Sequence, residues 1–303
     1  MGTSLFAVPI LKSLYQNGYT ISVVYTKRSQ KSGKVQKTYK SPIQNISENL
    51  NIECRTPDFL TDNNSEYDYL KKLNADIAIV VAYGLIIPKK FLNLTKKGFI
   101  NIHGSILPNW RGAAPIQRCI MNLDKETGIS IMKIVEKLDA GPVCSTYKIN
   151  LNQNENAQDI SDKLSHLAAD KISKNVNDIL LDNIKFIEQD HSKATYASKI
   201  EKSEGKINWN EMAISILGKI NGLFPTPGAF FIFQGERYKV LKAEISNIRG
   251  NAGEVVSDEL DVACGYGQSI KILEIQRQGK NPQKINQFML GSKIKRGSFI
   301  LNV

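Results

Sequence analysis

The sequence predicts an α/β protein, with a doubly wound, mostly parallel sheet followed by a smaller barrel of short strands. Three apolar runs, at residues 21–26, 76–82 and 98–103, are typical of strands buried inside a parallel sheet. From residue 229 onward, short strand-like segments alternate with glycine turns, which favours a small barrel. The 303 residues are enough for two domains of ordinary size.

Other segments fit this layout in order. Residues 65–73 are predicted to form a helix, and residues 127–134 alternate as in a strand. A helix at residues 211–220 precedes the barrel, whose predicted strands are residues 229–233, 238–245, 253–256 and 270–275. A long helix at residues 156–181 has apolar side chains at helical spacing, and these define its predicted core face: Ile160, Leu164, Leu167, Ile172, Val176 and Ile179.

Composition narrows the classes of function. The net charge of +11 favours a polyanionic partner. No apolar run is long enough to span a bilayer, and no signal peptide follows Met1, so we expect a cytoplasmic protein with no membrane partner. The three histidines are dispersed, and the cysteines are scattered without metal-ligand spacing, so we expect reduced thiols and no metal site: Cys54, Cys119, Cys144 and Cys264.

A polar pair stands at the carboxyl end of the run at residues 98–103. Asn101 and His103 are two residues apart, so a strand would point both side chains to one face. A loop rich in glycine and proline follows, and a helix is predicted to begin at Pro115. Open α/β sheets bind ligands at this edge, where an amide can donate a hydrogen bond and an imidazole can move a proton. Satisfied loop polar groups are the ordinary alternative.

The wider motif carries a resemblance. The string His-Gly-Ser-Ile-Leu-Pro-Asn-Trp-Arg-Gly-Ala-Ala-Pro-Ile at residues 103–116 resembles the signature of the folate-dependent formyltransferases, and its end resembles the branch that acts on methionyl-tRNA. The resemblance implies transfer of a formyl group from 10-formyltetrahydrofolate to the α-amine of initiator methionyl-tRNA, without a metal. It implies three catalytic residues, Asn101, His103 and the aspartate of a Leu-Asp-x-Gly segment, Asp139. It also implies a set of folate-binding residues: Tyr83, Gly84, Ser105, Ile106, Leu107 and Pro108.

A basic stretch at residues 27–40 holds six basic residues and no acidic one. A solvated loop is the plain explanation of such a run. In the tRNA-formylating branch, however, a basic loop at this place enters the acceptor stem, which implies a set of tRNA contacts: Lys27, Arg28, Lys31, Lys34, Lys37 and Lys40. Lys34 stands where that branch usually has arginine, so the charge is kept and the planar fork is lost.

The resemblance also sets domain boundaries. We expect a catalytic domain at residues 1–185, a linker at 186–205 and an OB-like tRNA-binding domain at 206–303, in a monomer. Residues 1–9 resemble the turn that follows the first strand of the family's sheet, so that strand is expected to be missing. An internal methionine taken as the start, or a truncated gene product, would each account for it.

Two alternatives remain open at this point. The chain could be another folate formyl enzyme, such as a glycinamide ribonucleotide formyltransferase or a 10-formylfolate hydrolase. It could instead be a non-catalytic RNA-binding protein descended from such an enzyme. The basic stretch and the second domain argue against the first alternative. The presence of Asn101, His103 and Asp139 argues against the second.

Overall fold

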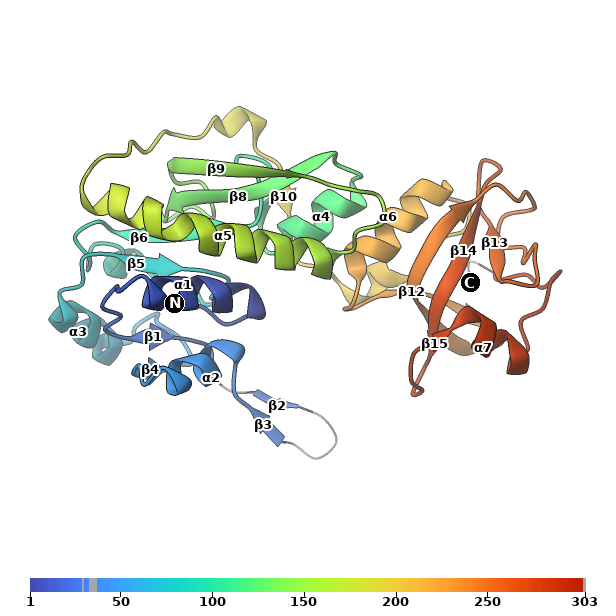
Figure 1. Cartoon of the computed structure of the whole chain (residues 1–303), viewed down its shortest axis with the longest axis horizontal. Coiled ribbons are helices and arrows are strands. Elements are labelled where there is room, and N and C mark those ends of the chain that lie inside the picture. Colours follow the sequence, from blue (N-terminus) through green and yellow to red (C-terminus); the bar gives the residue numbers. More distant parts are fainter. Residues whose placement is uncertain (29, 33–36, 302–303) are drawn as a thin grey trace. The chain divides into compact units, whose positions relative to one another are not determined.

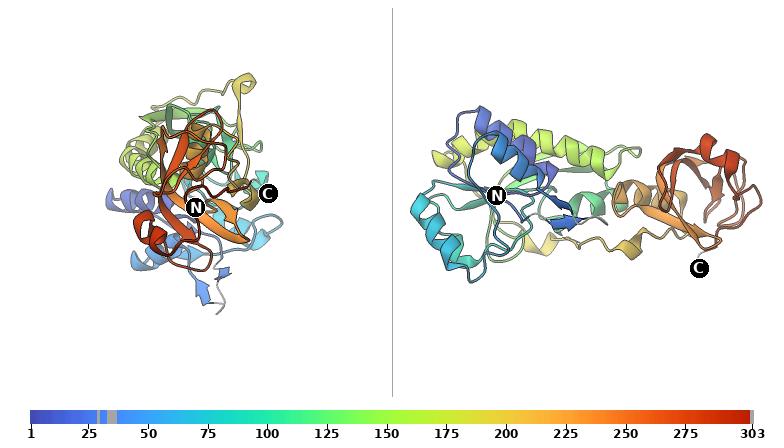
Figure 2. Two further views of the ribbon diagram at one scale, coloured as in Figure 1. Left: turned by 90° about the vertical axis from the view of Figure 1, so that its right-hand side faces the viewer. Right: turned by 90° about the horizontal axis from the view of Figure 1, so that it is seen from below.

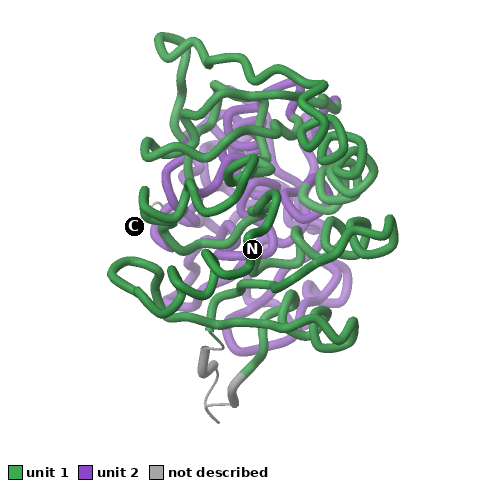
Figure 3. Tube along the Cα trace, turned by 90° about the vertical axis from the view of Figure 1, so that its left-hand side faces the viewer, with its two compact units in different colours: residues 1–112, 128–149, 161–196 green, residues 113–127, 150–160, 197–303 purple. Residues whose placement is uncertain are grey.

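The computed structural model describes residues 1–28, 30–32 and 37–301. The chain divides into two compact units, each built from several segments (Figure 3). The first unit contains Met1–Gly112, Gly128–Ile149 and Ser161–Tyr196, and the second contains Ala113–Thr127, Asn150–Ile160 and Ala197–Val303. The boundaries predicted from the sequence, at residues 185 and 206, stay a prediction. Among the described residues, no helix is long and apolar enough to cross a membrane.

The first unit is built on a mixed sheet. Its main part runs in the order β5 (Ala78–Val80), β6 (Phe99–His103), β8 (Glu126–Lys133), β9 (Val143–Asn150), as Figure 1 shows. Strand β6 is parallel to β5 and antiparallel to β8. A second parallel pair consists of β1 (Val24–Tyr25) and β4 (Cys54–Arg55). The doubly wound α/β class is therefore confirmed, with an antiparallel edge.

Met1 and Gly2 lie between β1 and β5, where a first strand was expected to be missing. The Gly2 amide donates to the carbonyl of Tyr25 at 2.8 Å, and the Val81 amide donates to the carbonyl of Met1 at 2.9 Å. Gly2 forms a parallel bridge with Val81. These two residues thus join the two parallel strand pairs through backbone hydrogen bonds.

Helices cover both faces of this sheet (Figure 2, right). Helices α1 (Val8–Gln16) and α5 (Ala157–Leu180) share one face, and α3 (Asn64–Leu73) lies on the other. Phe99 packs in a cluster with Leu70 of α3, whereas its neighbour Ile100 packs with Ile179 of α5, as strand alternation requires. Of the predicted core face of the long helix, only Leu167 is not buried.

Four shorter elements complete the first unit and its connections. A helix, α2, spans Pro42–Asn49 and begins at Ser41, whose hydroxyl accepts from the amide of Gln44. The basic stretch forms an antiparallel hairpin of β2 (Gln30–Ser32) and β3 (Lys37–Tyr39), not the loop expected from the sequence. The short strand β7 (Arg111–Gly112) pairs with β10 (Tyr196–Ala197).

The second unit contains a curled antiparallel sheet, a half-barrel consistent with the OB-like prediction (Figure 1). Its strands run in the order β11 (Ala229–Phe233), β12 (Glu236–Ser246), β14 (Ser269–Arg277), β13 (Asp261–Ala263), and β15 (Gln283–Lys284) pairs with β14. Register shifts between Val240 and Ala243 bend β12, which helps the sheet to curl. Residues 253–256, predicted as a strand, form only isolated bridges.

Helices α4 (Pro115–Met121) and α6 (Ala213–Leu223) of the second unit pack closely. Two glycines of α6 allow this, because a Cβ at Gly218 would lie 2.7 Å from Leu123 and one at Gly222 would lie 2.6 Å from Met121. The same unit has helix α7 (Ile285–Gly291) and an apolar core that includes Trp209, Phe231 and Tyr238.

Candidate active site

The candidate site begins at the carboxyl end of β6, an inner strand with β5 on one side and β8 on the other. Asn101 and His103 project from this strand two residues apart, as predicted. The His103 side chain is only 6% exposed, and Asn101 is partly buried. A rigid, buried strand therefore positions both side chains.

The loop after β6 is tied to β8 by two serines. The Ser105 hydroxyl donates to the carbonyl of Asn109 at 2.6 Å, which closes the loop on itself. Ser130 of β8 accepts from the amide of Leu107 at 3.0 Å and donates to the carbonyl of Ser105 at 2.8 Å. These bonds fix the backbone that leads from His103 to Trp110.

Asp139 brings the predicted triad together, although it is 36 residues further along the chain than His103. Its Oδ1 accepts from Asn101 Nδ2 at 3.4 Å, and its Oδ2 lies 3.7 Å from His103 Nδ1. The Gly112 amide donates to Oδ2 at 2.9 Å. Asp139 has a φ of +47°, in the left-handed region that aspartate tolerates better than most residues. One carboxylate thus lies beside both β6 side chains.

The hydrogen bonds of His103 define what its ring can do. Nε2 lies 2.9 Å from the carbonyl of Trp110, and because a carbonyl only accepts, Nε2 carries the proton in this bond. Nδ1 faces the Asp139 carboxylate at 3.7 Å, which is beyond direct hydrogen-bond range. The ring therefore stands between a fixed acceptor and an anion, where a proton on Nδ1 is stabilised by charge. With the Asn101 amide beside it, the cluster can donate hydrogen bonds and exchange a proton.

Comparisons with known proteins agree with this geometry. The sequence matches the formyl transferase family over residues 1–176 and the formyl transferase C-terminal domain family over residues 199–293. It is 64% identical over 303 residues to a methionyl-tRNA formyltransferase of Pelagibacter ubique, covering 100% of this chain and 98% of the relative. A methionyl-tRNA formyltransferase of Nitrobacter hamburgensis is 38% identical over 299 residues, covering 97% and 96% of the two chains. The chain belongs to the methionyl-tRNA formyltransferase family.

Solved structures show the same fold in more distant formyltransferases. The sugar 3N-formyl transferase WlaRD, solved in the presence of dTDP and 5-N-formyl-THF, gives a TM-score of 0.69 at 20% identity, covering 92% of this chain and 97% of that one. An N-formyltransferase of Helicobacter canadensis, solved with folinic acid and dTDP-3-aminofucose, gives 0.69 at 19% identity, covering 91% and 97%. At these identities the comparison establishes the fold alone.

The predicted folate residues of this formyltransferase occupy two loops of the first unit. Tyr83 has its ring buried among the core side chains that include Phe91, so its backbone, not its phenol, is available to a ligand. Burial raises the pKa of the Tyr83 hydroxyl. Gly84 is exposed with a φ of +75°, and the amine of Lys27 lies over it, 2.9 Å from where a Cβ would stand.

The second folate loop is residues 105–108. Ser105 is fully buried and bonded to the loop itself, so its hydroxyl supports the backbone of this formyltransferase. Leu107 is buried, and Ile106 and Pro108 are partly exposed. Surface for a ligand therefore comes from Ile106, Pro108 and the backbone.

The predicted tRNA residues lie along the hairpin and its two ends. Arg28 and Lys40 are exposed and pair with Asp58 and Glu48 at 2.9 and 2.7 Å. Exposed pairs of this kind contribute at most about 1 kcal/mol, so a polyanion can displace them. Lys31 lies on β2 and Lys37 on β3, and Lys34 lies outside the described residues.

Residues that the sequence did not single out complete the site. Gln189, placed in the predicted linker, is only 8% exposed and contacts both Arg111 and the turn that carries Asp139. A glutamine in a polar stretch gives no signal of this in the sequence. Among the described residues, no group of three or more His, Cys, Asp or Glu side chains could hold a metal. Burial raises the pKa of the Cys119 and Cys144 thiols to about 11, which suppresses the thiolate at neutral pH.

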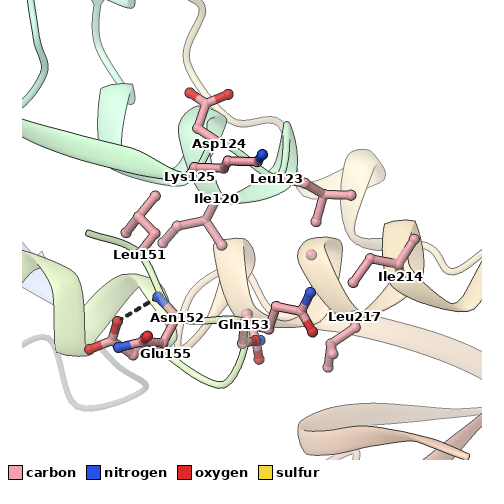
Figure 4. A pocket seen from close by; sticks show the side chains of 12 residues that line it. Ile120, Leu123, Asp124, Lys125, Leu151, Asn152, Gln153, Glu155, Ile214 and Leu217 are labelled. Carbon is pink, nitrogen blue, oxygen red and sulfur yellow. Dashed lines mark hydrogen bonds between the residues drawn. The ribbon is translucent and has the colours of Figure 1, made fainter. Parts of the chain in front are cut away.

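The second unit has a pocket of about 210 Å³ between α4, residues 151–155 and α6 (Figure 4). Its apolar wall includes Ile120, Leu151 and Leu217, and its rim includes Asp124 and Lys125. None of the residues predicted to carry the formyltransferase chemistry lines it.

Proposed function

We propose that this chain transfers the formyl group of 10-formyltetrahydrofolate to the α-amine of initiator methionyl-tRNA, with Asn101, His103 and Asp139 as its catalytic residues. One observation carries the assignment of residues: the Asp139 carboxylate lies within 3.7 Å of both β6 side chains. Membership of the methionyl-tRNA formyltransferase family supports the choice of substrates.

The reaction is an acyl transfer, in which negative charge develops on the formyl oxygen as the amine attacks. The Asn101 amide and the protonated His103 ring would donate to that oxygen, and they are already held on a buried strand. Loss of one such donor typically lowers the rate about 100- to 1,000-fold. Asp139 would keep His103 oriented and help remove the proton that the amine loses on attack.

Folate would lie against two loops at the carboxyl ends of β5 and β6, which are neighbouring parallel strands. The exposed backbone at Gly84 and the tied loop at residues 105–108 fit a flat, hydrogen-bonding ring system. This arrangement would bring the formyl group to Asn101 and His103. The co-substrate supplies the one-carbon group, and these residues supply binding and orientation.

The tRNA would be held by the basic hairpin and by the OB-like domain. Arg28 and Lys40 at the ends of the hairpin are exposed, as phosphate contacts require. The proposal includes the predicted domains at residues 1–185 and 206–303 with the linker 186–205, a monomeric state and a cytoplasmic location. Light scattering during gel filtration and cell fractionation test the last two.

The function is tested by incubating the purified chain with 10-formyltetrahydrofolate and charged initiator tRNA, and by measuring formylmethionine release. We expect transfer to wild type's tRNA acceptor and none to glycinamide ribonucleotide. Release of free formate without an acceptor, at the rate of transfer, would favour a hydrolase. Tight tRNA binding with no transfer would favour the non-catalytic alternative.

A further inference from the structure

Gln189 uses every hydrogen-bonding position of its side-chain amide. Its Oε1 accepts from Arg111 Nε at 3.1 Å and from Arg111 Nη2 at 2.7 Å. Its Nε2 donates to the carbonyl of Asp139 at 2.9 Å and to the carbonyl of Gly141 at 2.7 Å. An amide has two acceptor and two donor positions, so this side chain is fully satisfied although it is 8% exposed.

Backbone pairing places Gln189 beside that turn. Ile187 and Val143 exchange two amide hydrogen bonds, at 2.8 and 2.9 Å, in an antiparallel bridge. Two residues further along, in the same antiparallel register, Gln189 faces Gly141. A Cβ at Gly141 would lie 1.9 Å from the carbonyl oxygen of Lys133, so the turn lies directly against β8. The turn is therefore held by β8 on one side and by Gln189 on the other.

Arg111 anchors the other end of the network. Its side chain is 1% exposed, and it has no carboxylate partner among the described residues. Nη2 also donates to His191 Nδ1 at 2.9 Å, and Nη1 is buried without a partner in the described part of the chain. A buried guanidinium without a counter-ion is costly, so its main neutral acceptor, Gln189, is strongly constrained to stay in place. The next residue, Gly112, donates to the Asp139 carboxylate.

We propose that Gln189 is a positioning residue for formyl transfer, which holds the Asp139 carboxylate beside Asn101 and His103 by fixing the carbonyls of Asp139 and Gly141. Through Arg111 it also fixes the strand whose Gly112 amide binds that carboxylate. The two supports of Asp139, one on its backbone and one on its side chain, thus meet at one amide. The inference rests on the proposed role of Asp139.

The variant Gln189→Glu separates the two halves of the amide. A carboxylate keeps both bonds from Arg111 and gains a salt bridge, but it cannot donate to the two carbonyls and repels them. If Gln189 positions Asp139, kcat should fall about 10- to 100-fold, since a misplacement of about 1 Å can cost that much. The KM values for folate and tRNA should change by less than about two-fold. The melting temperature should stay near that of Gln287→Glu, which makes the same charge change at an exposed site.

A double-mutant comparison excludes a merely structural role. In an Asp139→Asn background, Gln189→Glu should cost little further kcat, because the carboxylate that it positions is already gone. Equal losses in both backgrounds, or wild-type kcat in Gln189→Glu, would overturn the inference. If Gln189→Glu does not fold, Gln189→Met, of similar length, replaces it, and loss of near-UV dichroism in both variants would also overturn it. Wild-type activity in Asp139→Asn would instead refute the proposed site, and the inference with it.

Discussion

The close contact between Gly141 and β8 gives the sharpest test of how the Asp139 turn works. In Gly141→Ala the new Cβ would stand 1.9 Å from the Lys133 carbonyl oxygen and 3.2 Å from Val135. Contacts below 3.0 Å are essentially never seen for a Cβ, so the turn must move by about 1 Å. Backbone on both sides makes side-chain relaxation ineffective. We expect a destabilisation of about 1–3 kcal/mol, as for other overpacked sites.

The same movement should displace the Asp139 carboxylate, two residues away. A shift of about 1 Å in a catalytic group lowers turnover by up to about 100-fold, so kcat per folded molecule should fall to about 1%. The assay measures formylmethionine release under saturating substrates, with the folded fraction taken from thermal melts of the same samples.

Gly265→Ala is the matched control for Gly141→Ala. Its Cβ would lie 2.1 Å from the carbonyl oxygen of Asn210, a clash of the same kind in the second unit, which holds none of the proposed catalytic residues. It should lose comparable stability and keep kcat per folded molecule. If Gly141→Ala keeps wild-type kcat and only melts earlier, the turn does not position Asp139 and our reasoning is refuted.

Three further predictions follow from the site and its surroundings. His103→Ala and Asn101→Ala should each lower kcat about 100- to 1,000-fold with the melting temperature and tRNA affinity kept, and near-wild-type turnover would contradict the mechanism. A triple alanine variant of the basic hairpin should raise the KM for tRNA and flatten its salt dependence, by about 0.9 in log–log slope per lost phosphate contact on duplex nucleic acid, and an unchanged slope would identify a solvated hairpin; the residues replaced are Lys31, Lys34 and Lys37. Burial works to raise the pKa of Glu66, but hydrogen bonds from Arg55 and Tyr25 outweigh it and hold that pKa below its ordinary value of 4.5. This stabilisation is present above pH 4.5 and is lost as pH falls, so Glu66→Gln should lower the melting temperature at pH 7 and the difference should narrow below pH 4.5; a constant difference down to pH 3 would exclude the effect.

Much of the first unit could be predicted from residue patterns. The inner strands are short apolar runs, and β6, predicted at residues 98–103, spans Phe99–His103. The spacing of Asn101 and His103 showed that the two would share a face. Asp139 could be placed only by resemblance, because nothing in an Asp-x-Gly turn states which strand it will approach. The family prediction is confirmed by the comparisons, whereas the site residues stay a prediction.

Other features had no local signal. The hairpin of β2 and β3 is polar along its length, so no hydrophobic alternation marks it, and it was wrongly expected to be a loop. Gln189 lies in a polar segment, and its burial depends on the pairing of Ile187 with Val143, far away in sequence. Long-range pairing of this kind is decided by tertiary packing, which local periodicity does not record.

The interleaving of the two units has a consequence for synthesis on the ribosome. The chain passes between the units five times, at residues 112, 127, 149, 160 and 196. Helix α4 leaves the exit tunnel about 90 residues before its packing partner α6, which at about 5–20 residues per second is roughly 5 to 18 seconds. During that delay the apolar side chains that later pack on Gly218 and Gly222 are exposed to water or to chaperones. Neither unit can therefore finish folding before the other has begun, and the nascent chain depends on protection that a protein with sequential domains would not need.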